Sequence, residues 1–390
     1  METTVNEELL TDEEIEDGLI EKLSLRDIIG TGHPNIERLR LFLMFCACVN
    51  MLGFPTKFGG LIRTLCGFAP IAFFILSGIL VLGDPENRRQ RIARSIKRTA
   101  LAFVIMLAAY VGINYLVYRS MGADILPMFK IKQVWINFLA FNTWPFNMGD
   151  AIWYVQSLLY AYIIIYFLDL LRLIKLDWLL FAALFLFSIA TGELNGIFHF
   201  SFMGYNAFPH NFINCALPYV LLGGLLARTV SRWTYLHPAF YIGGIALGAG
   251  LIVLEPLLLN KFNVPGYYDS LVGMPLIAVS VCLIVLQDVV QRDINDSGTA
   301  ALFDFPLMRR NTNMIYYLFQ PVAMVLGFLT IKLGEDVFAA ASNYLGLITF
   351  VILAFIALLS GYLNNYLNAR AMAKAKNSED EDEDTDNDGK

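Results

Sequence analysis

The sequence predicts an all-α fold, a polytopic membrane bundle of about ten transmembrane helices. Hydrophobic residues make up 57% of the 390 residues and charged residues only 16%, whereas a soluble domain has about 25% charged residues. Apolar runs of about 18 or more residues, the length of a membrane-spanning helix, recur along the chain. The charged residues cluster between these runs, as expected for the connections of a membrane protein.

Ten segments have the length and composition of a membrane span. In chain order they are 40–56, 61–82, 99–118, 149–170, 178–196, 211–227, 239–259, 271–290, 314–333 and 338–362. The first is the weakest, because it contains Asn50, Gly53 and Pro55. The apolar segment 134–141 is too short to span, so we expect an interfacial or buried helix there.

The basic residues predict the orientation of the chain. Lys and Arg are retained on the cytoplasmic side, and with ten spans most of the 28 fall on the side that holds both ends. We therefore expect a multi-pass protein of the cell membrane, with its lipid bilayer as a partner and both termini cytoplasmic. The domains would be an acidic cytoplasmic arm (1–37), a transmembrane domain (38–362) and a disordered acidic cytoplasmic tail (363–390).

One connection is unusually basic. The stretch RRQRIARSIKR (88–98) has six positive charges in eleven residues. It could serve only to orient the chain. Alternatively, Arg91, Arg94 and Arg98 would share one face of a helix, and guanidinium groups suit phosphate. The second interpretation predicts a site for a phosphate-bearing cytosolic donor or for lipid headgroups.

Four blocks in order resemble the motifs of the acyltransferase family 3 integral membrane proteins. They are PIAFFILSGILVL (70–82) with the basic run after it, DAIWYVQSLLYAYIIIYFL (150–168), NFINCALPYVLLGGLLAR (211–228) and NTNMIYYLFQPV (311–322). The resemblance implies ten spans. It also implies transfer of an acyl group, usually acetyl, from acyl-CoA as co-substrate to a hydroxyl of a cell-surface glycan or lipid-linked sugar.

The resemblance also points to an altered catalytic position. Arg40 corresponds to an arginine of the family's first span, and the family has a histidine eleven residues later, where this chain has Met51 beside Asn50. Gln320 stands where the family has a late histidine. An imidazole accepts a proton near neutral pH, whereas an amide or a thioether does not. Arg40 and Asn50 are therefore candidate catalytic residues. Arg40 could instead only flank the first span, and Asn50 could instead form a hydrogen bond between helices.

A replacement acid or base could come from the outer loop. Glu193 ends the fifth predicted span and His210 lies in the loop that follows. Ionisable residues at membrane depth are costly and therefore invite a functional interpretation. We expect these two residues to supply the missing proton transfer, unless both are simply solvated loop residues.

The remaining site predictions concern acyl-CoA on the cytoplasmic side of the membrane and the acceptor on the outer side. Ser77 would lie beside the acyl-CoA bound by the three arginines, and Trp153, Tyr154 and Gln320 would contact the acceptor. Each has a structural alternative. Ser77 and Gly78 could permit close helix packing, Trp153 and Tyr154 could belong to an interfacial aromatic belt, and Gln320 could satisfy a carbonyl freed by the following proline.

Other functional classes find less support in the sequence. The five cysteines show no metal-ligand spacing, so we expect no metal and no bound cofactor, and nothing indicates nucleic-acid binding. Two alternatives to the enzyme remain. The chain could be a non-catalytic relative that binds or translocates a glycan or lipid, or an unrelated transporter, which would predict inverted repeats with broken helices.

Overall fold

All regular secondary structure in the described residues of the computed structural model is helical. The described residues are 34–83, 87–146, 151–192, 194–195, 211–229, 233, 236–262, 271–295, 312–334, 336, 341–342 and 344–387. No strand occurs among them, which confirms the all-α prediction. A helix overlaps each of the ten predicted segments.

The described helices are, in chain order, α2 (Pro34–Leu52), α3 (Gly59–Leu65), α4 (Phe68–Leu82), α5 (Arg88–Ser120), η1 (Leu126–Lys130), α6 (Lys132–Phe141), α7 (Ile152–Leu170), η2 (Leu173–Leu176), α8 (Asp177–Thr191), η3 (Phe212–Ala216), α10 (Leu217–Arg228), α12 (Pro238–Lys261), α13 (Gly273–Asn295), α15 (Thr312–Leu333) and α17 (Leu345–Asn387). The short segment at 134–141 forms α6, which buries Phe138 and Phe141 and leaves Trp135 and Leu139 exposed.

Six described stretches of helix are long and apolar enough to cross a membrane. They are Gly59–Leu82, Arg88–Ser120, Ile152–Leu170, Leu173–Thr191, Pro238–Lys261 and Leu345–Leu363. Three further apolar helices are shorter, at Phe212–Arg228, Gly273–Gln287 and Tyr317–Leu333. The outer face of α5 exposes Leu101, Val104 and Ile105. A surface of this kind suits lipid better than water, in agreement with the predicted association with a bilayer.

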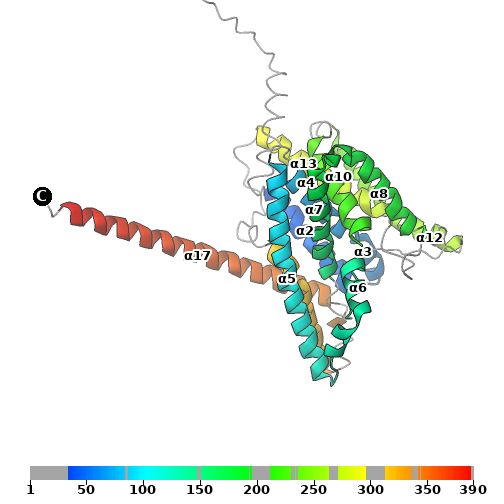
Figure 1. Cartoon of the computed structure of the whole chain (residues 1–390), viewed down its shortest axis with the longest axis horizontal. Coiled ribbons are helices and arrows are strands. Elements are labelled where there is room, and N and C mark those ends of the chain that lie inside the picture. The colour runs from blue at the N-terminus through cyan, green and yellow to red at the C-terminus, as the bar shows by residue number, and fades with distance from the viewer. Residues whose placement is uncertain are drawn as a thin grey trace, which may run out of the picture.

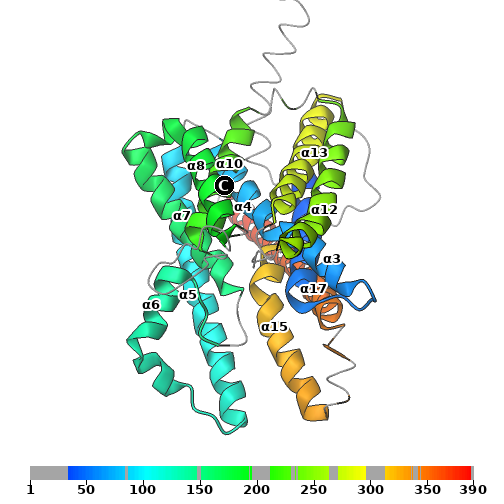
Figure 2. The same ribbon diagram turned by 90° about the vertical axis from the view of Figure 1, so that its right-hand side faces the viewer.

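Helix α4 lies at the centre of the bundle (Figures 1 and 2). It packs against α10 on one side and α13 on the other, and α12 packs beside α13. The contact with α10 is close because two glycines meet there. A Cβ on Gly78 would collide with the carbonyl oxygen of Val220, and one on Gly223 with that of Ile75. The predicted close packing at Ser77-Gly78 is therefore confirmed at Gly78, and it fixes the position of Ser77.

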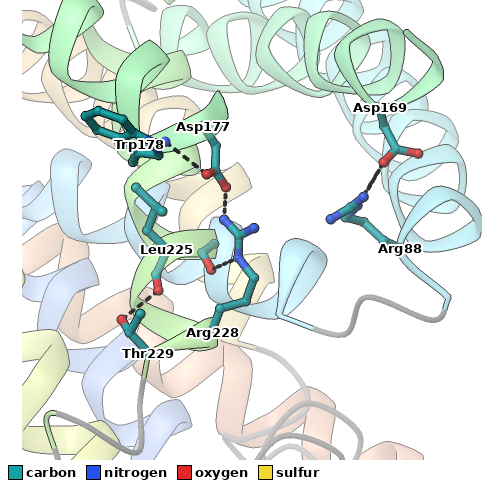
Figure 3. Close-up of polar contacts among 8 residues, drawn as sticks. Arg88, Asp169, Asp177, Trp178, Leu225, Arg228 and Thr229 are labelled. Carbon is teal, nitrogen blue, oxygen red and sulfur yellow. Dashed lines mark hydrogen bonds and ion pairs between the residues drawn. The ribbon is translucent and has the colours of Figure 1, made fainter. Parts of the chain in front are cut away.

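The basic run forms the first turns of α5. Arg88 and Arg89 both bind Asp169 at the end of α7, with nitrogen–oxygen distances of 2.6 and 3.1 Å. A third ion pair joins Asp177, the first residue of α8, to Arg228, the last residue of α10 (Figure 3). Both carboxylates are buried. These three ion pairs connect four helices at the same end of the bundle.

The structure describes the two ends of the chain to different extents. Helix α2 begins at Pro34, and residues 1–33 of the predicted arm lie outside the described residues. At the other end, α17 continues as a helix to Asn387 and extends away from the bundle (Figure 1). The sequence contains no Gly or Pro from 362 to 388, so no helix breaker interrupts it.

Candidate functional site

A cavity of about 110 Å³ lies where five helices meet, and we call it the Arg40 cavity. Residues of α2, α4, α5, α7 and α15 line it. They are Arg40, Met44, Phe73, Leu76, Ser77, Leu80, Thr99, Tyr154, Val155, Leu158 and Tyr317. The cavity therefore brings together Arg40, Ser77 and Tyr154, three residues that the sequence analysis singled out separately.

Hydroxyl groups and one guanidinium form the polar part of this cavity. The Ser77 side chain hydrogen bonds with the side chains of Tyr154 and Tyr162. Arg40 and Tyr317 interact electrostatically with both tyrosines. Guanidinium, serine and tyrosine groups can all donate hydrogen bonds. The cluster can therefore bind an anionic or carbonyl oxygen.

A buried carboxylate holds Arg40. Glu37 lies three residues earlier on α2, is 9% exposed and pairs with the Arg40 guanidinium. Residues three apart on a helix are neighbours, so the spacing of Glu37 and Arg40 in the sequence could have predicted this pair. Tyr162 and Tyr317 were not predicted either. Their position in the cluster depends on helix packing, which the sequence alone does not give.

A second, smaller cavity of about 20 Å³ adjoins the first, and we call it the Asn50 cavity. Its lining residues are Ala47, Asn50, Met51, Pro70, Phe73, Ala151, Trp153, Tyr154 and Phe319. A volume of this size is enough for about one water molecule. Phe73 and Tyr154 line both cavities, so these two side chains form the wall between them.

Asn50 forms hydrogen bonds between helices, which was the alternative to a catalytic role. Its amide nitrogen donates to the carbonyl oxygen of Arg63 at 3.0 Å, and Arg63 Nε donates to the carbonyl oxygen of Asn50 at 2.7 Å. These bonds join the end of α2 to α3. Met51, at the position of the family histidine, lines the Asn50 cavity beside it. Asn50 thus has a packing role and also borders a cavity.

The three predicted acceptor residues are buried but occupy different places. Trp153 and Tyr154 are 6% and 8% exposed, and the Tyr154 ring stacks on Phe74 with centroids 4.4 Å apart. Rings so enclosed do not fit the alternative of an aromatic belt at the membrane surface. Gln320 lines neither cavity. Its side-chain oxygen accepts a hydrogen bond from the Ala151 nitrogen at 2.8 Å, which holds the start of α7.

The arginines of the basic run lie beside the Arg40 cavity and not inside it. Arg91, Arg94 and Arg98 are on one helix, as predicted, and none of them lines the cavity. Arg91 Nη1 donates to the Leu80 carbonyl at 3.5 Å, and Leu80 lines the cavity. Arg98 directly precedes Thr99, another lining residue. Arg94 and Arg98 are exposed, so both are available to a ligand outside the cavity.

Two predicted catalytic residues, Glu193 and His210, lie outside the described residues. Among the described residues, no group of three or more His, Cys, Asp and Glu could hold a metal ion. The residues that line the Arg40 cavity include neither a carboxylate nor an imidazole. The lining of the cavity therefore supplies hydrogen-bond donors and a positive charge. The Glu37 carboxylate is paired with Arg40, so a free proton acceptor would have to come from elsewhere.

Comparisons of the chain with protein-family models, with curated proteins and with solved structures give no match, so its family is a prediction from the motifs.

Proposed function

We propose that the protein is an integral membrane O-acyltransferase, which uses acyl-CoA to acylate a hydroxyl of a glycan or lipid-linked sugar. One observation carries this proposal. Arg40, Ser77, Tyr154 and Tyr317 come from four distant segments and line a single cavity. Three of them belong to the blocks that resemble the family, and a fourth block packs behind the cavity through Gly223. If these segments served only to contact lipid, their polar residues would not be expected to line one cavity.

The chemistry of the cavity suits the carbonyl end of a thioester. When a hydroxyl oxygen attacks the thioester carbon, negative charge develops on the carbonyl oxygen and the carbon–sulfur bond then breaks. Arg40 and Ser77 would donate hydrogen bonds to that oxygen, and stabilisation of this kind often contributes more to the rate of acyl transfer than any other effect. The free thiol of coenzyme A leaves. The hydroxyl proton would pass to Glu193 or His210.

The phosphates of coenzyme A would bind outside the cavity. Arg94 and Arg98 are exposed on the first turns of α5, and Arg91 reaches the cavity wall at Leu80. Guanidinium groups bind phosphate oxygens with charge-assisted hydrogen bonds. On the other side of Phe73 and Tyr154, the acceptor would approach past Trp153 and the Asn50 cavity.

In this proposal the chain crosses the cell membrane ten times with both termini in the cytoplasm. A helix overlaps every predicted span, and Lys and Arg concentrate in the connections that this arrangement places inside. The ion pairs of Asp169 and Asp177 would then belong to the cytoplasmic end (Figure 3). Labelling of single cysteines introduced at Lys57 and Arg94 with a membrane-impermeant reagent would locate the two ends of the bundle.

Turnover by the purified full-length protein tests the enzymatic proposal. In lipid nanodiscs, labelled acetyl-CoA with candidate glycans should give labelled product and free thiol. Replacing Arg94 and Arg98 with alanine should raise the KM for acyl-CoA and weaken its dependence on salt. The matched control replaces Lys130 and Lys132, which are exposed beyond the far end of α5, and should leave KM unchanged. No transfer or hydrolysis with any acyl chain or glycan would contradict the proposal.

A non-catalytic binding protein is the second candidate. It is favoured by the lack of an imidazole or carboxylate among the lining residues of either described cavity. Under this alternative, the protein would bind acyl-CoA or a glycan without turning it over. Substituting Met51→His would introduce an imidazole into the Asn50 cavity. Turnover gained only in that variant would support the binding protein, whereas turnover by the natural chain would support the enzyme.

A further inference from the structure

Two buried thiols contact each other at the junction of α2 and α3. Cys46 lies on α2 and Cys66 directly follows α3, and their side chains are 3% and 8% exposed. The two thiols are joined by a side-chain hydrogen bond. Neither lines the Arg40 cavity or the Asn50 cavity, so the proposed function leaves this pair without a role.

An independent contact fixes the same register of the two helices. The side chains of Asn50 and Arg63 each bond to the other's backbone. Cys46 lies one helical turn before Asn50 on α2, and Cys66 lies three residues after Arg63. The backbone nitrogen of Cys66 bonds to Ile62 at 2.9 Å, which continues the last turn of α3. The antiparallel register that pairs Asn50 with Arg63 therefore also brings the two cysteines to one level.

We propose that Cys46 and Cys66 are a redox modification site, a dithiol that an organic disulfide oxidises to a covalent bridge between α2 and the segment joining α3 to α4. A disulfide needs its sulfur atoms about 2 Å apart, closer than in a thiol–thiol hydrogen bond. The two segments must therefore approach each other slightly. Both thiols are free, so the reduced state is the one that the structure describes.

The oxidation proceeds by two thiol–disulfide exchanges. The thiolate of one cysteine attacks an aromatic disulfide, forms a mixed disulfide and releases one aryl thiol. The second cysteine then attacks the mixed disulfide, forms the Cys46–Cys66 bond and releases the second aryl thiol. Two electrons pass from the protein to the oxidant, and the two cysteine protons end on the aryl thiols. An apolar oxidant is required because the apolar bundle excludes charged reagents.

The bridge would act on the walls of both cavities. Cys46 lies on α2 between Met44, which lines the Arg40 cavity, and Ala47, which lines the Asn50 cavity. Cys66 is followed by Gly67, where a Cβ would meet the side chain of Met274 on α13. Oxidation would therefore tie α2 to the central helices, and we expect it to raise the thermal midpoint of the protein.

Peptide mapping of the intact protein tests this proposal. The full chain in nanodiscs is treated with an apolar aromatic disulfide, then unfolded in denaturant that contains an alkylating reagent and digested without reduction. We expect a peptide pair joined through Cys46 and Cys66, and two of the five thiols protected from alkylation. A folded protein in which Cys46 stays reduced, carries only the oxidant's aryl group, or joins another cysteine would overturn the proposal.

Cys48 offers the matched control. It is 1% exposed and lies two residues from Cys46, on another side of α2. Cys48→Ala should leave the cross-link intact, whereas Cys66→Ala should abolish it. Cross-linking of Cys46 to Cys48 in the Cys66→Ala variant at the natural chain's rate would overturn the assignment. Because the result for the natural chain needs no variant, a variant that fails to fold does not affect the test.

Discussion

Asp169 on α7 accepts two hydrogen bonds from Arg88 on α5, at 2.6 Å from Nη2 and 2.9 Å from Nε. Both bonds reach the same carboxylate oxygen, and the other oxygen accepts from Arg89 at 3.1 Å. Asp169 is 7% exposed. One buried carboxylate thus compensates two of the six charges of the basic run, which distinguishes a structural part of the run from the arginines that follow.

Asp169→Asn should destabilise the protein because it leaves Arg88 and Arg89 without a counter-charge. Removing one partner of a buried ion pair costs about 3–5 kcal/mol, and we expect about 3 kcal/mol because Arg88 is partly exposed. The thermal midpoint in nanodiscs measures the change. Arg89→Ala is the control: its side chain is 54% exposed, so its loss should have a much smaller effect. An unchanged midpoint for Asp169→Asn would show that the ion pairs do not hold α5 to α7.

Gly223→Ala should force α4 and α10 apart. A Cβ at this position would meet the carbonyl oxygen of Ile75, and a backbone atom cannot move aside alone. We expect a loss of about 2 kcal/mol or more, within the range for overpacked cores. Gly243→Ala on α12 has nothing within 4 Å of the new Cβ. It should be neutral or slightly stabilising because alanine favours a helix, and equal midpoints for the two variants would contradict the close contact.

Arg40→Gln should reduce turnover if the Arg40 cavity stabilises a developing oxyanion. Loss of one such donor lowers kcat by about 10²–10³. Tyr162→Phe should have a smaller effect, because Tyr162 contacts Ser77 and does not line the cavity. Rates at saturating acyl-CoA separate an effect on kcat from an effect on binding. If Arg40→Gln raised KM alone, Arg40 would serve substrate binding and not the chemical step.

Asn50→Ala and Arg63→Ala should each cost about 1 kcal/mol, the usual net value of one hydrogen bond. Each side chain bonds to the other's backbone, so the two bonds are separate and their losses should add. Thermal midpoints of the two single variants and the double variant give the comparison. A double variant no worse than either single one would mean that the two bonds form and break together.

The positions of the helices were largely accessible from the sequence, because apolar runs bounded by charges are a strong signal. The details that differ have local causes. The predicted span 61–82 is divided into α3 and α4 around Cys66 and Gly67, and helix α5 starts at Arg88, the first residue of the basic run. Arginine favours helix, so a run with no Gly or Pro continues the span that follows it. Charge alone did not distinguish a loop from a helix here.

The site was accessible only in part. Arg40, Ser77 and Tyr154 were identified from motifs and they line one cavity. Tyr162 and Tyr317 were missed because an aromatic residue in an apolar helix resembles any other core residue. Their convergence depends on how α7 and α15 pack around α4, and helical spacing within one segment does not determine packing between segments.

Phe73 and Tyr154 have a consequence for any pair of ligands in this protein. Both side chains line both cavities. A molecule in the Arg40 cavity and a molecule in the Asn50 cavity would therefore both contact Phe73 and Tyr154. A rotamer change at Phe73 would alter the shape of both cavities at once. Binding in one cavity would then affect binding in the other through Phe73 and Tyr154.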